Sequence, residues 1–281
     1  MPESSIYAAP RVVTDLADCH FYHSMDLPGY GTVQGEWDLR EGIGAYLGNV
    51  DFKGKRVLEM GTASGFVGFH MEKAGAKVIG YDLSDAQAWD VVPFARYDSD
   101  DFLRKRRAHI KRMNNAYWLS HSALGSRNKV VYGHVYSVPR EIGGVDVSTF
   151  GSILLHVRDP FLALQNALAL TREQVIVTDL VRLLSLSTWQ RVTGKVLRRG
   201  RAAPSLRFVP DWRIGEPKET WWRLSPETIQ EFIGVLGFEK SAVSYHYQTY
   251  VGHTSDGRNS TARLRHFTLV GTRTAGHSVV P

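Results

Sequence analysis

From residue 56 onward, short apolar runs alternate with longer segments whose apolar positions recur with a helical period. A short run rich in valine and isoleucine and bounded by turn residues is typical of a buried strand. Because helical segments connect these runs, the strands are expected to lie parallel, joined by right-handed crossovers. Five runs fit the pattern: residues 56–61 (RVLEMG), 77–83 (KVIGYDL), 128–135 (NKVVYGHV), 145–151 (VDVSTFG) and 174–180 (QVIVTDL).

The end of the chain breaks this alternation. Residues 237–250 and 263–272 are both strand-like, and the segment between them contains Asp256-Gly257, which is a turn signal. When the connection between two strands is too short to hold a helix, the strands pair with each other in antiparallel orientation. We therefore expect a Rossmann-like α/β sheet of seven strands, mostly parallel, with a C-terminal antiparallel hairpin.

The connections between the strands indicate one domain with extensions. The chain has 281 residues and no internal repeat or long Pro/Ser linker. We expect a catalytic domain over residues 46–281, preceded by a segment, residues 1–45, that covers its site. Residues 181–236 form a connection longer than one crossover helix requires, so a lid-like insertion is expected around residues 181–222. The connection over residues 82–128 is also long and contains a basic helical stretch.

Composition narrows the possible locations and partners. The chain is 43% hydrophobic and 22% charged, and no stretch approaches the roughly 18 apolar residues of a membrane helix. No secretory signal is visible, so a cytoplasmic location and no membrane partner are expected. The single cysteine, Cys19, is expected to be a small buried residue. The net charge of +6 is concentrated in residues 103–112 and 195–207, which either face an anionic partner or form solvated surfaces.

The most informative motif is the glycine-rich segment that follows the first strand, residues 57–68 (VLEMGTASGFVG). Glycines at such a strand-to-helix turn let the backbone approach a nucleotide-like ligand. The dinucleotide pattern G-x-G-x-x-G is not met, because Ala63 and Phe66 replace its second and third glycines. A second acidic residue, Asp82, ends the next strand, where a carboxylate can accept hydrogen bonds from both ribose hydroxyls.

The segment from Glu59 to Gly65 resembles motif I of the class I S-adenosylmethionine methyltransferases. Three further stretches resemble the methyltransferase family that includes the tRNA wobble-uridine carboxymethyltransferases and related small-molecule enzymes: residues 22–40, residues 154–160 (LLHVRDP) and residues 220–223 (TWWR). The carboxymethylating members have a tyrosine where this chain has Leu155. The resemblance therefore implies ordinary methyl transfer from S-adenosylmethionine.

The resemblance also implies roles for particular residues. The cofactor is expected to lie over the glycine turn, with its ribose at Asp82 and its adenine near residues 133–136, while Trp37 either shields the sulfonium or only packs. The expected cofactor-binding residues are Glu59, Gly61, Thr62, Ala63, Gly65, Asp82, Leu83, His134, Val135 and Trp37. His156, just after the fourth strand, acts either as a base or as a scaffold that holds its loop, and His23 and Tyr22 are alternative catalytic groups. No metal site is expected, since Asp179 has no neighbouring ligands to complete one.

We therefore predict a methyltransferase that acts on an oxygen or nitrogen of a small molecule. A natural-product intermediate is one candidate acceptor. One alternative is a tRNA-modifying enzyme of the same fold, because the basic runs suit nucleic acid, although no RNA-binding module is recognisable. The other alternative is a cofactor-binding partner protein without transfer activity. The sequence leaves the oligomeric state open.

Overall fold

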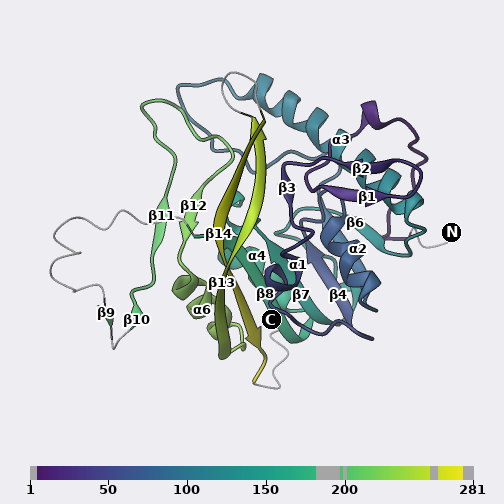
Figure 1. Cartoon of the computed structure of the whole chain (residues 1–281). Coiled ribbons are helices and arrows are strands. Elements are labelled where there is room, and N and C mark those ends of the chain that lie inside the picture. Colours follow the sequence, from purple (N-terminus) through teal and green to yellow (C-terminus); the bar gives the residue numbers. More distant parts are fainter. Residues whose placement is uncertain (1–4, 182–196, 199–200, 254–258, 275–281) are drawn as a thin grey trace.

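The computed structural model describes residues 5–181, 197–198, 201–253 and 259–274. Its centre is an eight-stranded sheet (Figure 1). The five predicted runs form strands β4 (Arg56–Met60), β5 (Lys77–Asp82), β6 (Lys129–Tyr132), β7 (Val145–Gly151) and β8 (Thr171–Leu180). The predicted hairpin forms β13 (Lys240–His253) and β14 (Asn259–Thr272).

The strand order across this sheet is β3-β13-β14-β8-β7-β4-β5-β6. Strands β4 to β8 pair parallel, and β14 lies antiparallel between β8 and β13. The predicted sheet with its C-terminal hairpin is therefore confirmed. One strand of this sheet was not predicted: β3 (Trp37–Asp38) pairs with Thr249 and Tyr250 of β13. It covers part of an edge that would otherwise be open.

Alternate residues of β4 enter two different hydrophobic clusters, one on each face of the sheet. Leu58 and Met60 pack with α4 (Pro160–Leu168) and α6 (Pro226–Val235). Val57 belongs to the cluster of α1 (Ile43–Tyr46) and α2 (Phe66–Lys73). Burial on both faces explains why the parallel strands read as continuous apolar runs rather than as alternating patterns.

Caps in the sequence fix where two helices begin. The Asp159 carboxylate accepts a hydrogen bond from the Leu162 N–H at the start of α4, and the Ser225 hydroxyl accepts one from the Thr228 N–H at the start of α6. Each cap is followed by a proline, which suits the first helical position. The long 82–128 connection contains α3 (Asp100–Ala123), the long helix at the top of Figure 1.

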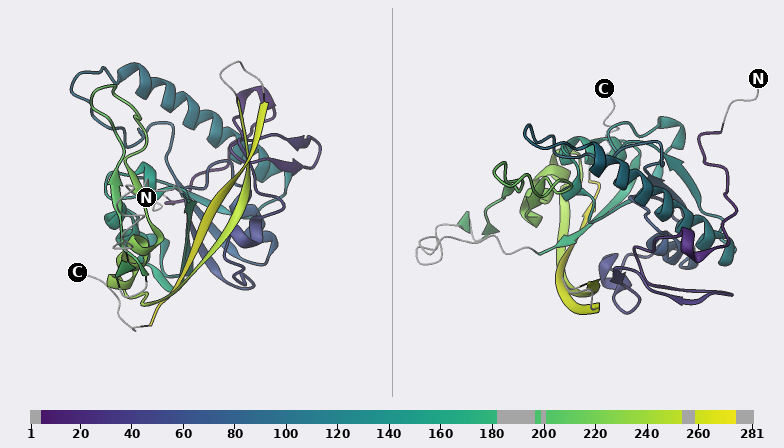
Figure 2. Two further views of the ribbon diagram at one scale, coloured as in Figure 1. Left: turned by 60° about the vertical axis from the view of Figure 1, so that its left-hand side comes forward. Right: turned by 90° about the horizontal axis from the view of Figure 1, so that it is seen from above.

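The N-terminal segment packs against α3. Cys19, which is buried as predicted, and Phe21 belong to one cluster with Ala116 and Leu119 of the helix. The β1–β2 hairpin of this segment and the β11–β12 pair lie at opposite ends of the molecule (Figures 1 and 2). The remaining elements are β1 (Met25–Leu27), β2 (Gly31–Val33), β9 (Leu197–Arg198), β10 (Arg201–Ala202), β11 (Leu206–Phe208), β12 (Trp222–Leu224), η1 (Leu16–Asp18), η2 (Arg140–Ile142) and η3 (Leu154–His156).

Two expectations concern parts of the chain that the structure describes incompletely. The expected lid around residues 181–222 includes residues 182–196 and 199–200, which lie outside the described residues, as does Asp256-Gly257 at the tip of the hairpin. Within the described part, no helix has the length and apolar character needed to span a membrane.

Candidate active site

A cavity of about 450 Å³ lies at the carboxyl ends of β4, β5, β6 and β7, with α3 among its walls. This is the edge where open α/β sheets bind ligands. The cavity brings together residues from the N-terminal segment, the glycine turn and the loops after three other strands. Eight of the predicted site residues line it: Tyr22, Gly61, Ala63, Asp82, Leu83, His134, Val135 and His156.

The glycine turn between β4 and α2 has the backbone conformation that the motif predicts. Gly61 has φ +81° and Gly65 has φ +92°, which are left-handed values that side chains disfavour. Ala63 also has a positive φ, 48°, which is uncommon for a residue with a side chain. A Cβ at Gly61 would lie 3.2 Å from Ile153 Cδ1, so the absence of a side chain keeps this wall of the cavity open.

Asp82 closes the turn from the neighbouring strand. Its Oδ2 accepts a hydrogen bond from the Ala63 N–H and its Oδ1 accepts one from the Leu83 N–H, both at 2.7 Å. Since a carboxylate offers about four lone-pair positions, two remain for a ligand with two neighbouring hydroxyls. Burial raises the pKa of Asp82. The carboxylate, the glycine turn and the cavity beside them therefore fit the ribose and the chain of a nucleoside cofactor.

Glu59 lies inside the turn rather than on the large cavity. It is only 4% exposed, and its Oε2 accepts a hydrogen bond from the Thr62 hydroxyl at 2.6 Å. Burial raises the pKa of Glu59 to about 8. Glu59 borders a smaller cavity of about 20 Å³ that also touches Gly61 and His23. The predicted cofactor residues Glu59, Thr62 and Gly65 thus shape the turn and do not line the main cavity.

Of the three predicted catalytic residues, two line the main cavity. His156 follows β7, and its Nδ1 lies 2.6 Å from the carbonyl oxygen of Glu219. Because a carbonyl only accepts, Nδ1 carries a proton in this contact. Burial raises the pKa of Tyr22 above its usual range. His23 is separate: it is buried, burial lowers its pKa to about 4, and it does not line the main cavity.

Trp37 also lies away from the main cavity. Its ring is buried in β3 and packs at 4.9 Å from the Tyr250 ring and at 5.2 Å from the His266 ring, measured between centroids. Trp37 thus packs within this aromatic group and does not line the main cavity, and a role at the sulfonium stays a prediction.

Sequence reasoning missed a second group of cavity residues, gathered around Trp89. Arg106 lies with its guanidinium 4.8 Å from the Trp89 ring centroid and 3.1 Å from a Glu219 carboxylate oxygen. The His109 ring lies 6.2 Å from the Trp89 ring. Glu36 completes this wall. Two signals in the sequence pointed to this group: the length of the 82–128 connection, which carries three of these five residues, and the basic run over residues 103–112, which contains Arg106 and His109.

The comparisons with known proteins give the fold a name. No family model matches the chain, and no curated protein matches its sequence. Among solved structures, the N-terminal domain of EvdMO1, crystallised in the presence of SAH and D-fucose, is similar with a TM-score of 0.51 and 15% identity, over 90% of this chain and 91% of that chain. Magnesium protoporphyrin IX methyltransferase (ChlM) from Synechocystis with bound SAH matches with a TM-score of 0.47 and 12% identity, over 84% of this chain and 82% of that one.

The chain has the class I methyltransferase fold. In this fold the carboxyl ends of the parallel strands form the ligand edge, which is where the main cavity lies. The narrower resemblance to the wobble-uridine carboxymethyltransferases receives no support from the family comparison and stays a prediction.

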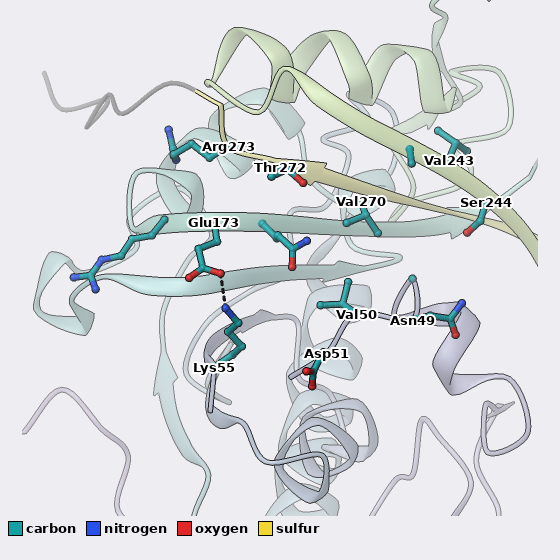
Figure 3. A pocket seen from close by; sticks show the side chains of 14 residues that line it. Asn49, Val50, Asp51, Lys55, Glu173, Val243, Ser244, Val270, Thr272 and Arg273 are labelled. Carbon is teal, nitrogen blue, oxygen red and sulfur yellow. Dashed lines mark hydrogen bonds and ion pairs between the residues drawn. The ribbon is translucent and has the colours of Figure 1, made fainter. Parts of the chain in front are cut away.

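A larger cavity, of about 860 Å³, lies at the other edge of the methyltransferase sheet (Figure 3). It is bordered by the amino-terminal end of β8, by β13 and β14, and by residues 48–55. Its main polar feature is an ion pair between Lys55 Nζ and a Glu173 carboxylate oxygen at 2.6 Å. Parallel sheets seldom bind ligands at this edge, and none of the predicted site residues lines this cavity.

The basic run on α3 is largely engaged within the protein. Arg104 and Lys105 both pair with Asp101 in the first turn of the helix. Arg106 points to the cavity group, and Arg112 donates hydrogen bonds to the carbonyl oxygens of Ala17 and Cys19. The run is therefore divided: Arg104 and Lys105 stay at the surface in exposed ion pairs, whereas Arg106 and Arg112 bind other parts of the chain. The second basic run, residues 195–207, lies partly outside the described residues.

The described residues contain no group of three or more side chains that could hold a metal ion. Asp179 accepts a hydrogen bond from the Leu180 N–H at 2.7 Å. Asp179 is buried near the end of β8, where it pairs with Phe267 of β14.

Proposed function

We propose that this chain is an S-adenosylmethionine-dependent methyltransferase that transfers a methyl group to an oxygen or nitrogen of a small molecule. The observation that carries the proposal is that the glycine turn, Asp82 and His156 share one cavity with the group around Trp89. One part of this cavity suits a nucleoside, and the other supplies polar and aromatic side chains for an acceptor. Two proteins of similar structure, EvdMO1 and ChlM, were crystallised with SAH.

The chain's own residues would hold and orient the two ligands. When bound, S-adenosylmethionine supplies an electrophilic methyl group on a sulfonium. Asp82 would accept hydrogen bonds from the ribose, and His134 and Val135 would lie beside the adenine. Because a sulfonium is already reactive, alignment and exclusion of water account for most of the protein's contribution. His156 would act either as a base or by holding the loop through Glu219.

The parts expected to cover the site are consistent with this proposal. Tyr22 and Glu36 belong to the N-terminal segment, and Glu219 belongs to the described end of the expected lid; all three line the cavity. We propose that the described parts of the N-terminal segment, residues 1–45, and of the 181–222 insertion cover the cofactor and the acceptor, which would exclude water from the sulfonium. A cytoplasmic location stays a prediction.

A small molecule is favoured over tRNA because four of the six cations on the basic stretch of α3 have partners within the protein. Arg104 and Lys105 remain exposed but each already pairs with Asp101, and Arg106 and Arg112 are turned toward other parts of the chain, so fewer charges remain to exchange counterions with phosphates. An acceptor that enters the cavity beside Trp89 needs no such charges.

Two measurements test the proposal. Titration calorimetry with SAH should give saturable binding, and labelled methyl groups should pass from S-adenosylmethionine to a small-molecule extract of the source cells. Labelling of unmodified tRNA instead, with binding that weakens steeply between 50 and 200 mM salt, would establish the nucleic-acid alternative. Tight SAH binding without any transfer would establish the non-catalytic alternative. Absence of SAH binding would reject the cofactor assignment itself.

A further inference from the structure

The group around Trp89 forms one end of the main cavity's wall. Trp89 contacts Arg106 at 4.8 Å, and its ring lies 5.9 Å from the His156 ring and 6.2 Å from the His109 ring. Glu219 reaches this end through its ion pair with Arg106. A ligand here would meet two imidazoles, an indole and a guanidinium whose charge is already matched by a carboxylate.

Negatively charged side chains outnumber positively charged ones along the cavity. Among the described residues that line it, four are carboxylates and one is a guanidinium: Glu36, Asp82, Asp90, Glu219 and Arg106. The formal charges of these five side chains sum to −3, so negative groups outnumber the positive one in the lining. Such a lining attracts the cationic cofactor of the proposed function and repels phosphate and carboxylate groups.

The same charges favour a hydroxyl over an amine as the methyl acceptor. Nearby carboxylates stabilise an ammonium ion and raise its pKa. An ammonium has no lone pair with which to attack a methyl group, so an amine bound here would be held in its unreactive form. A hydroxyl keeps its lone pairs at neutral pH and can donate a hydrogen bond to carboxylates, which only accept.

The cavity also contains a base that is neutral at physiological pH. The pKa of His109 is lowered to about 4, chiefly by burial and also by the nearby His20, Arg106 and Arg112, while Glu36 acts in the opposite direction. The His20 ring stands between the other two groups: it lies 4.3 Å from the His109 ring, and its Nε2 lies 3.0 Å from Glu36 Oε1. The Glu36 carboxylate would thus stabilise an imidazolium formed at His109.

Resting on the proposed function, we propose that the acceptor is an uncharged, hydroxylated small molecule that is methylated on oxygen, and that His109 takes the hydroxyl proton. The acceptor oxygen forms its bond to the methyl carbon while the sulfur–carbon bond breaks and its electron pair stays on sulfur. The product of this step is a protonated ether, an oxonium ion, whose proton is strongly acidic. An imidazole of low pKa is therefore basic enough to remove it and later release it to water.

The acceptor class is tested by separating the small-molecule extract of the source cells before the reaction. The extract is passed over an anion exchanger at pH 7.5, and both fractions are incubated with labelled S-adenosylmethionine and the full-length protein. Acceptor activity is expected in the unretained fraction. Activity in the retained, anionic fraction, or an N-methylated product, would overturn the proposal.

The role of His109 is tested with His109→Gln and with His70→Gln on α2 as a matched control. His109→Gln is expected to lower the transfer rate at least about 100-fold, with SAH affinity unchanged, and the control should transfer normally. A measurement that needs no cofactor is an NMR titration of the imidazole ¹⁵N signals. The signals of His109 should remain those of a neutral ring from pH 8 down to pH 5. A His109→Gln protein that transfers at the normal rate, or a His109 that titrates near pH 6.5, would overturn its role.

SAH binding and the fraction that is methylated together distinguish a failure of this inference from a failure of the proposed function. If SAH does not bind, the proposed function is wrong. If SAH binds and neither fraction accepts a methyl group, both the catalytic part of that function and the inference are wrong. If SAH binds and anionic compounds are methylated, only the inference is wrong.

Discussion

Replacing Asp82 by alanine is expected to weaken cofactor binding without unfolding the sheet. The carboxylate already accepts hydrogen bonds from the Ala63 and Leu83 N–H groups, and two lone-pair positions remain for the ribose hydroxyls. Hydrogen bonds to a charged group contribute about 1.5 to 3 kcal/mol each. Allowing for water that replaces them, we expect a loss of about 3 kcal/mol, which corresponds to SAH affinity lower by roughly 150-fold.

Titration calorimetry with SAH measures this effect directly. The matched control is Asp85→Ala, three residues further along the same connection. Asp85 forms a partly exposed ion pair with Arg11 at 3.5 Å and does not line the cavity. Such pairs contribute little, so the control should bind SAH normally. If Asp82→Ala retains wild-type affinity and a normal melting curve, the ribose does not bind at this carboxylate.

Further predictions follow from other parts of the site. Gly61→Val should abolish SAH binding in calorimetry while circular dichroism stays native, because a valine disfavours φ +81° and its side chain would crowd Ile153 at the cavity wall. Burial raises the pKa of Glu59 to about 8 from 4.5, so the folded state holds a proton that the unfolded state releases, and this stability is lost as pH rises between those values. Urea unfolding should show a decrease of up to about 4 kcal/mol from this group between pH 5 and pH 8, absent in Glu59→Gln. Residues 22–40 should exchange backbone hydrogens more slowly when SAH is added, and equal exchange would contradict a covering role.

The strands and the turn were predictable because their signals are local. Residues 56–61 and 77–83 carry their own apolar patterns, and the glycines of the turn stand next to Glu59 in sequence. Asp82 was also within reach of sequence reasoning, since adjacent parallel strands end at the same edge.

The group around Trp89 was not predictable, because it depends on how distant segments meet. His109 lies in a helix that reads as a basic surface, and it becomes a cavity residue only because the N-terminal segment brings His20 and Glu36 beside it. Trp37 and His23 looked equally suitable as site residues from their neighbours in sequence. Their positions were set by packing against β13 and α2, which no local pattern reveals.

A crystal structure of the protein grown with SAH tests the central claim most directly. The account predicts SAH in the cavity at the carboxyl ends of β4 and β5, with its ribose hydroxyls hydrogen-bonded to Asp82 and its adenine beside His134 and Val135. SAH bound instead in the larger cavity beside Lys55 (Figure 3), or a main cavity that stays empty at millimolar SAH, would contradict it.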